Sequence, residues 1–552
     1  MIIVGAGLSG LATALGVALR GQRAVVLEAA DLVGGAAAYS GGQVWVGANH
    51  VAAREGIDDD LVRAELYVRA IANDDPECLD EEAMLRWLHI APEAARYWEE
   101  TGAIRWAVIP GLSDYHREAD GALGEGRYLT NEVIAGGVLG DWRARLRVSP
   151  FFPVGTTYAD MFAKGRRLAK VDSDAAAADG YAGVPAFGVA GAGAAATAPI
   201  ESDDPLTFGP GVVAGFLARV LQEDGIEILT ERRVTELVTE DGRVVGVRAA
   251  GREFRGPVVL ATSTYDWDPE LVREFLGLEP DEFGSIGPET IRGDGVRLAR
   301  SVGGAIARIP PTSVPLLPGW LLPSGSGYGY GPEYAQPHCI IVDRSGRRYC
   351  DDSYWVDIVA KTLAPDDRHL PFFLVWDDEH RQDYGLGDTP PGGAYPDGWV
   401  QSAPTLRELA TRLGVDGEAL ERTVARFNLH AARGEDPDHG RGTNPQVLTF
   451  TGDPQHRPSP VLGALERPPF HGIRLRFLGT AIGSSGVRID ADGHVMNEGG
   501  SPIDGLYAVG ACAALTTTGT GYNSGFALGR GLTLAYLVAA ELAGTPVPDT
   551  PQ

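Results

Sequence analysis

The stretch MIIVGAGLSG, residues 1–10, decides the fold of this chain. Residues 1–4 are a short apolar run that is typical of a buried parallel strand, and the apolar sequence from residue 11 continues as a helix. Between them lie Gly5, Gly7 and Gly10, with the spacing G-x-G-x-x-G. The first glycine allows the tight turn, the second lets the backbone approach a pyrophosphate, and the third lets helix and strand pack closely. The diphosphate would sit at the helix N-terminus, where unpaired N–H groups and the helix dipole favour negative charge.

A second predicted strand, residues 23–27, ends at Glu28. An acidic side chain at this point accepts hydrogen bonds from the ribose of an adenine nucleotide. Strand, turn, helix, strand and acid in this order are far more specific than the glycines alone. The sequence therefore predicts a Rossmann-like α/β domain that binds a dinucleotide.

The N-terminal run has two other interpretations, a membrane span and a signal peptide, because residues 1–19 carry no charge. No basic segment precedes the run, and three glycines interrupt it. Glu28 and Asp31 follow it without the lysines or arginines that flank an anchor. We therefore expect neither a span nor a signal peptide.

Composition indicates a large protein with more than one hydrophobic core. At 552 residues the chain exceeds the size at which one core usually divides. The net charge of −27 argues against binding to nucleic acid or to anionic membranes, which would repel it. The four cysteines lie far apart in sequence without a C-x-x-C motif or a cluster of zinc ligands, which favours reduced thiols in the cytoplasm and no metal site.

The rest of the chain divides into three parts. Residues 1–280 and 473–552 contain apolar strands and helices of the dinucleotide-binding domain, including an amphipathic helix expected at 211–225, a strand at 258–263 and a long apolar helix after a strand at 505–513. Residues 281–472 mix strands, prolines and helices, and we expect an inserted α+β substrate (cap) domain. The Ala- and Gly-rich residues 174–198 predict an exposed insertion. Its GAGAAA, residues 191–196, follows no apolar strand, so we do not expect a second nucleotide site.

The chain resembles the flavoproteins of the fumarate reductase and 3-ketosteroid dehydrogenase type over nearly its whole length. The marks of the resemblance are VGAGLSG with Glu28, the glycine-rich GGAAAYSGG (34–42), GDG (293–295), VDRSGRRYCDD (342–352), GLYAVGACA (505–513) and SGFALGRG (524–531).

The resemblance implies FAD as the cofactor. Some members attach FAD through a histidine in the first glycine loop, where this chain has Gly35, so we expect FAD to be bound non-covalently. The positions that match the cofactor site of the family are Gly5, Ala6, Gly7, Leu8, Ser9, Gly10, Glu28, Ala29, Gly34, Gly35, Ala36, Ser40, Gly41, Gly42, Val234, Ala261, Gly510, Ser524, Gly525, Ala527 and Leu528. Val234 and Ala261 would lie at the adenine, and the residues from Gly510 onward at the isoalloxazine ring.

Two differences from the fumarate reductases restrict the kind of substrate that we expect for this chain. Val356 stands near their catalytic arginine, and the segment before Ser524 lacks their substrate arginine and histidine. A dicarboxylate substrate would thus have no arginine to bind it in a bidentate manner. Its charges would lose their water on binding without gaining an ionic partner, which is unfavourable. In their place, Tyr354, the Tyr522–Ser524 segment and Tyr115 resemble the tyrosine and serine positions of the Δ4-(5α) and Δ1 branches of the 3-ketosteroid dehydrogenases.

Such an enzyme desaturates a ketone beside its carbonyl. A base removes the proton of the α-carbon, and the flavin accepts a hydride from the β-carbon. We expect Tyr354 to be the base, with Tyr115 supporting it or lining the pocket. Tyr522, together with the Gly525 N–H or the Ser524 hydroxyl, would stabilise the enolate-like oxygen, as an oxyanion hole does. Ser524 is also a residue type that is favoured as a helix N-cap.

The predicted function is therefore FAD-dependent desaturation of a small apolar cyclic ketone, steroid-like or smaller. The expected partners are that ketone and an external electron acceptor, either a quinone, oxygen or a redox protein. The reverse reaction, reduction of an activated alkene, and a flavin-fold protein that binds a ligand without turnover remain as alternatives.

Overall fold

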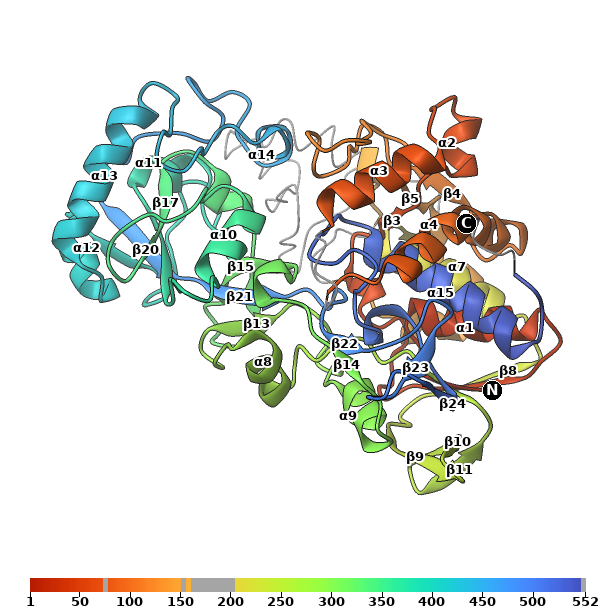
Figure 1. Cartoon of the computed structure of the whole chain (residues 1–552). Helices are drawn as coiled ribbons and strands as arrows, with labels where there is room; N and C mark the ends of the chain where they lie inside the picture. Colours follow the sequence, from red (N-terminus) through yellow and green to blue (C-terminus); the bar gives the residue numbers. More distant parts are fainter. Residues whose placement is uncertain (73–77, 150–154, 160–203, 548–552) are drawn as a thin grey trace.

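The computed structural model describes residues 1–72, 78–149, 155–159 and 204–547. The expected insertion at 174–198 and the sequence GAGAAA within it lie outside the described residues. Two groups of elements, each around its own hydrophobic core, lie on the two sides of Figure 1.

The first core is built on a six-stranded sheet in the order β23-β24-β12-β1-β2-β8. All neighbours in this sheet are parallel except β23 and β24. The strands are β1 (Ile2–Val4), β2 (Ala24–Leu27), β8 (Ile226–Leu229), β12 (Val258–Leu260), β23 (His494–Met496) and β24 (Pro502–Ala508). The N-terminal strand is thus central and fully buried, as its apolar sequence predicts.

Helices surround this sheet. Helix α1 packs against both α7 and α15, and α4 packs against α15. The helices of this part are α1 (Leu8–Ala18), α2 (His50–Arg54), α3 (Leu61–Ile71), α4 (Glu81–Glu100), α7 (Phe208–Val220) and α15 (Phe526–Leu542). The expectation of an amphipathic helix at 211–225 is wrong: α7 is buried everywhere except at Ala218 and Arg219, because α1 and the turn at 37–39 cover it.

Smaller sheets extend the first part. An antiparallel sheet in the order β11-β10-β9 projects at the bottom of Figure 1, and β3, β5 and β4 form another sheet beside α15. The bounds are β3 (Val44–Trp45), β4 (Trp106–Val108), β5 (Tyr128–Asn131), β6 (Ile134–Ala135), β7 (Pro205–Leu206), β9 (Val234–Glu240), β10 (Arg243–Ala249) and β11 (Arg252–Arg255), with β6 paired to β7.

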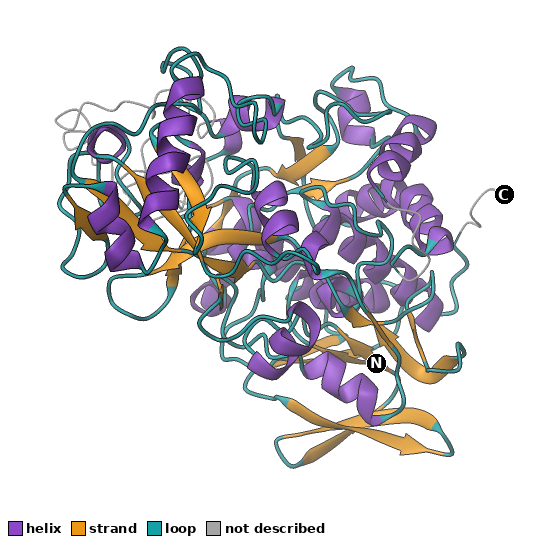
Figure 2. Cartoon of the chain, turned by 60° about the vertical axis from the view of Figure 1, so that its left-hand side comes forward, coloured by secondary structure: helices purple, strands orange, loops and turns teal. Residues whose placement is uncertain are grey.

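The second core surrounds an antiparallel sheet in the order β17-β18-β20-β19. Its strands are β17 (Cys339–Asp343), β18 (Phe372–Trp376), β19 (Gln401–Ala403) and β20 (Phe470–Arg474). The helices of this part are α10 (Trp355–Thr362), α11 (Asp378–Asp383), α12 (Leu406–Leu413), α13 (Gly417–Ala431) and α14 (Pro445–Phe450). Figure 2 shows this mixed packing of strands and helices from another side.

Elements between the two cores connect them. A sheet in the order β13-β21-β15-β16 and the pair β14–β22 lie between the two sides in Figure 1, with α8 and α9 below them. The bounds are α8 (Pro269–Leu276), β13 (Phe283–Ser285), α9 (Asp294–Ser301), β14 (Ile306–Ala307), β15 (Leu316–Leu321), β16 (Tyr328–Gly329), β21 (Arg476–Gly479) and β22 (Gly486–Val487).

The helices and the cysteines can be compared with the expectations of no membrane span and of reduced thiols. No helix among the described residues has both the length and the apolar character needed to cross a membrane. No disulfide bond joins the four cysteines, all of which belong to the described part of the chain and are buried.

Candidate functional site

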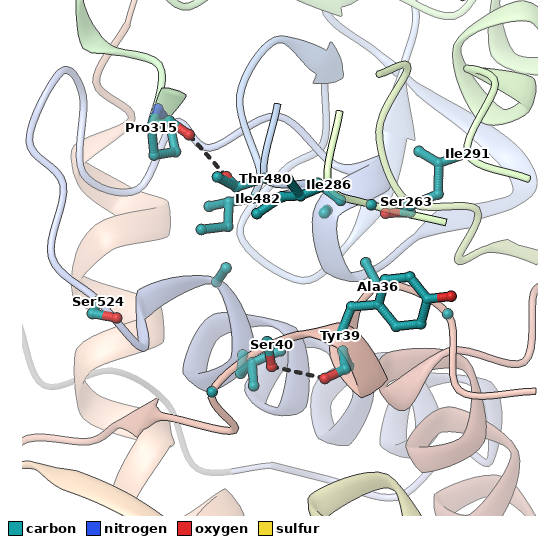
Figure 3. Close-up of a pocket in the computed structure, with 18 of the residues that line it drawn as sticks. Ala36, Tyr39, Ser40, Ser263, Ile286, Ile291, Pro315, Thr480, Ile482 and Ser524 are labelled. Atoms are coloured by element: carbon teal, nitrogen blue, oxygen red, sulfur yellow. Dashed lines mark hydrogen bonds between the residues drawn. The ribbon is translucent and has the colours of Figure 1, made fainter. Parts of the chain in front are cut away.

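A large cavity of about 340 Å³ runs from the turn after β1 toward the second core. Both parts of the chain contribute to its walls. In Figure 3, Ile286, Thr480 and Ile482 lie on one side of the space, and Ala36, Tyr39, Ser40 and Ser524 on the other. The wall on the side of the second core is largely apolar and aromatic, with Pro315, Leu317, Pro318, Tyr330, Pro332, Tyr334, Trp355 and Val447.

The turn between β1 and α1 forms one end of this cavity. Gly5 has a φ of +110°, and a Cβ added there would lie 2.5 Å from the Ala261 carbonyl oxygen. A Cβ at Gly10 would lie 2.1 Å from the Gly5 carbonyl oxygen, so only glycine permits this helix–strand approach. Gly7, the N-cap of α1, has no side chain that could accept a hydrogen bond from the first N–H groups of the helix. The helix N-terminus therefore faces the cavity with its backbone N–H groups uncovered.

Glu28 is buried at the end of β2 and lines the cavity. Its Oε2 accepts a hydrogen bond from the Ala6 N–H at 2.8 Å, and its Oε1 accepts one from the Ala30 N–H at 2.9 Å. Burial raises the pKa of this carboxyl, and these two donors together with the charge of Arg147 oppose the rise. Each carboxylate oxygen keeps a lone pair for a hydroxyl donor from the cavity.

Most of the predicted cofactor positions lie on the cavity wall. They are Gly5, Gly7, Leu8, Ser9, Glu28, Ala29, Gly35, Ala36, Ser40, Gly41, Val234, Ala261, Gly510, Ser524, Gly525, Ala527 and Leu528.

Four predicted cofactor positions do not line the cavity and instead shape the loops behind it. Ala6 donates to Glu28, and Gly10 packs against Gly5. Gly34 donates its N–H to the Ala6 carbonyl oxygen, and Gly42 has a φ of +66° and packs against the backbone of Phe208.

The loop before α15 forms the opposite end of the cofactor wall. The helix begins at Phe526, and its N-cap is Gly525 with a φ of +82° and no side-chain cap. A Cβ at Gly525 would lie 2.7 Å from the Trp45 backbone nitrogen. The interpretation of Ser524 as a helix cap is therefore wrong, because its hydroxyl donates to Oε1 of Gln43 instead.

The three tyrosines predicted to be catalytic, Tyr115, Tyr354 and Tyr522, all line this same cavity. The ring centroids of Tyr115 and Tyr522 are 6.2 Å apart, and Trp355 packs edge-on to Tyr522 at 5.7 Å. Burial raises the pKa of all three phenols, and Ser524 lies within hydrogen-bond distance of the Tyr115 and Tyr522 hydroxyls. Tyr354 lies at the N-cap of α10, and the charge of a Tyr115 phenolate would raise its pKa further.

Comparison with known proteins places this chain in a family. The sequence profile described as "FAD binding domain" matches residues 1–529. The chain belongs to this family of FAD-binding proteins. The prediction of a flavoprotein oxidoreductase with FAD as its cofactor is confirmed.

Two similar proteins of known activity cover nearly the whole flavoprotein. The 4-oxocyclohexanecarboxylate 2-dehydrogenase of Sinomonas cyclohexanicum is 30% identical over 99% of this chain and 92% of its own length. The 3-oxosteroid 1-dehydrogenase of Mycobacterium tuberculosis (strain ATCC 25618 / H37Rv) is 28% identical over 98% of each chain. Both names describe dehydrogenation of a ring that carries a ketone.

Solved structures share the fold. The 3-ketosteroid Δ1-dehydrogenase from Sterolibacterium denitrificans superposes with a TM-score of 0.83 at 23% identity, covering 98% of this chain and 99% of the other. The 3-ketosteroid Δ4-(5α)-dehydrogenase from Rhodococcus jostii RHA1 has a TM-score of 0.60 at 20% identity, covering 98% and 96%. The flavoprotein thus has the expected fold of a Rossmann-like FAD-binding part with a cap.

The residues of the flavoprotein fit FAD on structural grounds. A Cβ added to Gly7 would lie 3.9 Å from the Gly35 Cα, so two glycine backbones leave open the space that a pyrophosphate needs. Two helix N-termini without side-chain caps, those of α1 and α15, begin at residues of the same wall. Glu28 lines the same wall and would supply the acidic group that accepts a ribose hydroxyl.

Sequence reasoning missed two residues of the site, Gln43 and Tyr158. Gln43 accepts the Ser524 hydroxyl and forms a hydrogen bond with Tyr158. The Tyr158 hydroxyl also donates to the Gly41 carbonyl oxygen at 2.6 Å. The signal for Gln43 was its place directly after the second glycine pair, whereas nothing in the sequence around Tyr158 distinguishes it.

One group of potential metal ligands lies outside the cavity, in the second core. His338, Asp377 and Glu379 lie close together there. Asp377 accepts backbone N–H groups from Glu379 and His380 on one oxygen and from residues 466 and 467 on the other. The His338 Nδ1 lies 2.7 Å from the Ala464 carbonyl oxygen. Asp377 and His338 thereby connect the segments at 377–380 and 464–467.

Proposed function

We propose that this protein is an FAD-dependent dehydrogenase that introduces a carbon–carbon double bond next to the carbonyl of a cyclic ketone. The observation that carries the proposal is one cavity that brings together the dinucleotide turn, three tyrosines and the loop before α15. The ketone would lie between the flavin edge of this cavity and the apolar wall of the second core.

Desaturation needs a proton acceptor at the α-carbon and a hydride acceptor at the β-carbon. FAD supplies the hydride acceptor when it is bound. The α-proton goes to a side chain of this protein, and the electrons of that C–H bond form the new double bond as the hydride leaves. An external electron acceptor must then take up the two electrons for the next turnover.

We assign the base to Tyr354. Its phenol lies on the cavity wall, and its backbone begins α10, a rigid element of the second core. A phenol has a reference pKa of about 10, and burial raises it further, so the neutral form predominates near neutral pH. Proton transfer from an activated α-carbon then depends on how strongly the ketone oxygen is stabilised.

We assign the stabilisation of the ketone oxygen to Tyr522 and the Gly525 N–H. The Tyr522 phenol lines the cavity directly before the N-terminus of α15. The Gly525 N–H donates no hydrogen bond within the part of the chain that the structure describes. Because the Ser524 hydroxyl proton is used in the bond to Gln43, we favour the backbone N–H over this hydroxyl as the second donor.

The ketones named for the two relatives are the substrates to examine first. One relative acts on a 4-oxocyclohexanecarboxylate and the other on 3-oxosteroids. The apolar and aromatic wall formed by Pro315, Leu317, Tyr334 and Trp355 suits a ring system with little polarity. We further infer a quinone, oxygen or a redox protein as the electron acceptor, and a cytoplasmic location from the absence of disulfides among its cysteines.

The test is product analysis with an artificial electron acceptor. Purified holoprotein incubated with a 3-oxosteroid and, separately, with 4-oxocyclohexanecarboxylate should yield a product that has lost two hydrogen atoms beside the carbonyl. Recovery of both ketones unchanged, with FAD fully bound, would refute the proposal.

A further inference from the structure

Asn523 lies at the centre of the hydrogen bonds that join two segments of the candidate active site. Its side chain is fully buried, at 0% exposure, between Tyr522 and Ser524 in the sequence. The Asn523 Oδ1 accepts the Tyr67 hydroxyl at 2.7 Å and the backbone N–H of Tyr115 at 3.0 Å. The Asn523 Nδ2 donates to the Ser524 carbonyl oxygen at 2.9 Å.

His116 makes a second connection between the same segments. The Nε2 atom of its ring lies 3.2 Å from the Tyr522 carbonyl oxygen. Its backbone N–H donates to the Tyr67 hydroxyl at 3.3 Å. The Tyr67 hydroxyl thus bonds to both segments, since it donates to Asn523 next to Tyr522 and accepts from His116 next to Tyr115.

A buried ionic group anchors this arrangement to the protein core. The Arg127 guanidinium bonds to Asp114 at 2.8 Å and to Asp59 at 2.7 Å, and all three side chains are nearly inaccessible. Asp114 directly precedes Tyr115 and also accepts the Trp45 indole N–H at 2.8 Å. The interactions of Asp114 therefore hold the segment with Tyr115 to the protein core. A hydrogen bond of Asn523 joins this segment to the one that carries Tyr522.

We propose that Asn523 is a positioning residue that sets the placement of the Tyr115 phenol relative to Tyr522 and Ser524. The inference rests on the proposed function, in which these side chains act on the ketone. Asn523 itself does not line the cavity, so it acts through the two backbones that it joins.

An amide suits this position because it supplies an acceptor and a donor in one plane. An apolar side chain of similar size would leave the Tyr67 hydroxyl and the Tyr115 N–H buried without an acceptor, and the segments would shift to find other partners. A displacement of about 1 Å of a catalytic group costs on the order of 10² in rate.

The experiment measures the rate at which a saturating ketone bleaches the flavin absorbance in the absence of oxygen. The ketone is whichever of the 3-oxosteroids and 4-oxocyclohexanecarboxylate the wild-type holoenzyme oxidises fastest. Asn523→Leu is compared with wild type, and the same substitution is made in a Tyr115→Phe/Tyr522→Phe double variant. Asn49→Leu is the matched control, because Asn49 is 2% exposed and also makes three hydrogen bonds, away from the tyrosines.

We expect Asn523→Leu to lower the bleaching rate by about 10- to 100-fold and to change the apparent Kd of the ketone much less. In the double variant the phenol hydroxyls are already missing, so the same substitution should lower the rate by less than about 2-fold. Asn49→Leu should leave the rate unchanged. Equal slowing in both backgrounds, or a wild-type rate in Asn523→Leu, would overturn the positioning role.

The outcome for the double variant separates this inference from the proposed function. If Tyr115→Phe/Tyr522→Phe bleaches its flavin at the wild-type rate, the assignment of the tyrosines fails and the role of Asn523 fails with it. If Asn523→Leu does not fold, Tyr67→Phe removes the bond to Asn523 and the bond from the His116 N–H, and it keeps the ring against Trp45. It should slow bleaching in the native background and not in the double variant, and equal slowing in both would again overturn the inference.

Discussion

The rings of Tyr115 and Tyr522 meet edge to face, with centroids 6.2 Å apart and planes at 70°. The two residues are about 400 positions apart in the sequence, and the Ser524 hydroxyl lies within hydrogen-bond distance of both phenols. Tyr354 completes the group from the second core. The candidate active site therefore exists only when both parts of the chain are folded together.

Tyr522→Phe should slow the reaction with a ketone while leaving the protein intact. The substitution removes one donor to the developing enolate oxygen and keeps the ring that packs on Tyr115 and Trp355. Loss of such a donor typically costs on the order of 10²–10³ in rate, about 3–4 kcal/mol. Anaerobic bleaching of the flavin by a saturating ketone measures the effect, and FAD content and Tm serve as controls. A rate close to that of wild type would remove Tyr522 from the mechanism.

Tyr354 should give the reaction a characteristic dependence on pH. Burial is the main cause that raises the pKa of its phenol. The negative charges of nearby groups raise the pKa further; these groups are Tyr115, Glu118, Asp351 and Asp357. Below that pKa the phenolate fraction grows about tenfold for each pH unit, so the bleaching rate should rise with pH through the alkaline range. In Tyr354→Phe the rate should be low and independent of pH over the same range. A variant that keeps the slope of wild type would show that another group is the base.

Glu28→Gln should weaken FAD binding. The carboxylate accepts two backbone N–H groups and faces the cavity, and the amide can neither accept on both of its terminal atoms nor carry the charge. A hydrogen bond to a charged group contributes about 1.5–3 kcal/mol, so the Kd for FAD should rise on the order of 10- to 100-fold. Titration of apoprotein with FAD measures this, with exposed Glu55→Gln as the control. Equal affinities in the two variants would exclude Glu28 from the cofactor site.

Asp352→Asn should destabilise the second core and disturb Tyr354, two residues away. Asp352 is fully buried and bonds to Arg348 at 2.7 Å and to Arg441 at 3.1 Å. Although burial opposes it, the charge of these arginines holds the pKa of Asp352 well below its usual range. Loss of one partner of such a group costs about 3–5 kcal/mol of unfolding free energy.

The pH dependence of this effect follows from the lowered pKa. The contribution of the Asp352 carboxylate is fully present above about pH 4, the unfolded value, and declines as the pH falls toward the folded value. The difference between wild type and Asp352→Asn in denaturant unfolding should therefore shrink in acid. Exposed Asp366→Asn is the control, and a constant difference at all pH values would contradict the ionic role.

The sequence predicted the cofactor end of the site better than the substrate end. The turn at Gly5 and Gly10 and the acid at Glu28 follow from local geometry, since each is required by contacts within a few residues or between adjacent strands. The contact of Ser524 with Gln43, and that of Asn523 with Tyr67, join residues more than 400 positions apart and depend on how the loop before α15 meets the residue before β3 and helix α3. No local pattern indicates such contacts. The expectation of an amphipathic α7 is wrong for the same reason, because α1 and the turn at 37–39, which are distant in sequence, cover the helix.

The most direct test of the account is anaerobic mixing of the purified holoprotein with a cyclic ketone and, separately, with NADH. One dinucleotide turn lies in the described part of the chain, and FAD occupies that site in our account. We predict that a 3-oxosteroid or 4-oxocyclohexanecarboxylate bleaches the flavin absorbance within seconds, while NADH leaves it unchanged. Bleaching by NADH with no response to either ketone would contradict it and would favour reduction of an activated alkene instead.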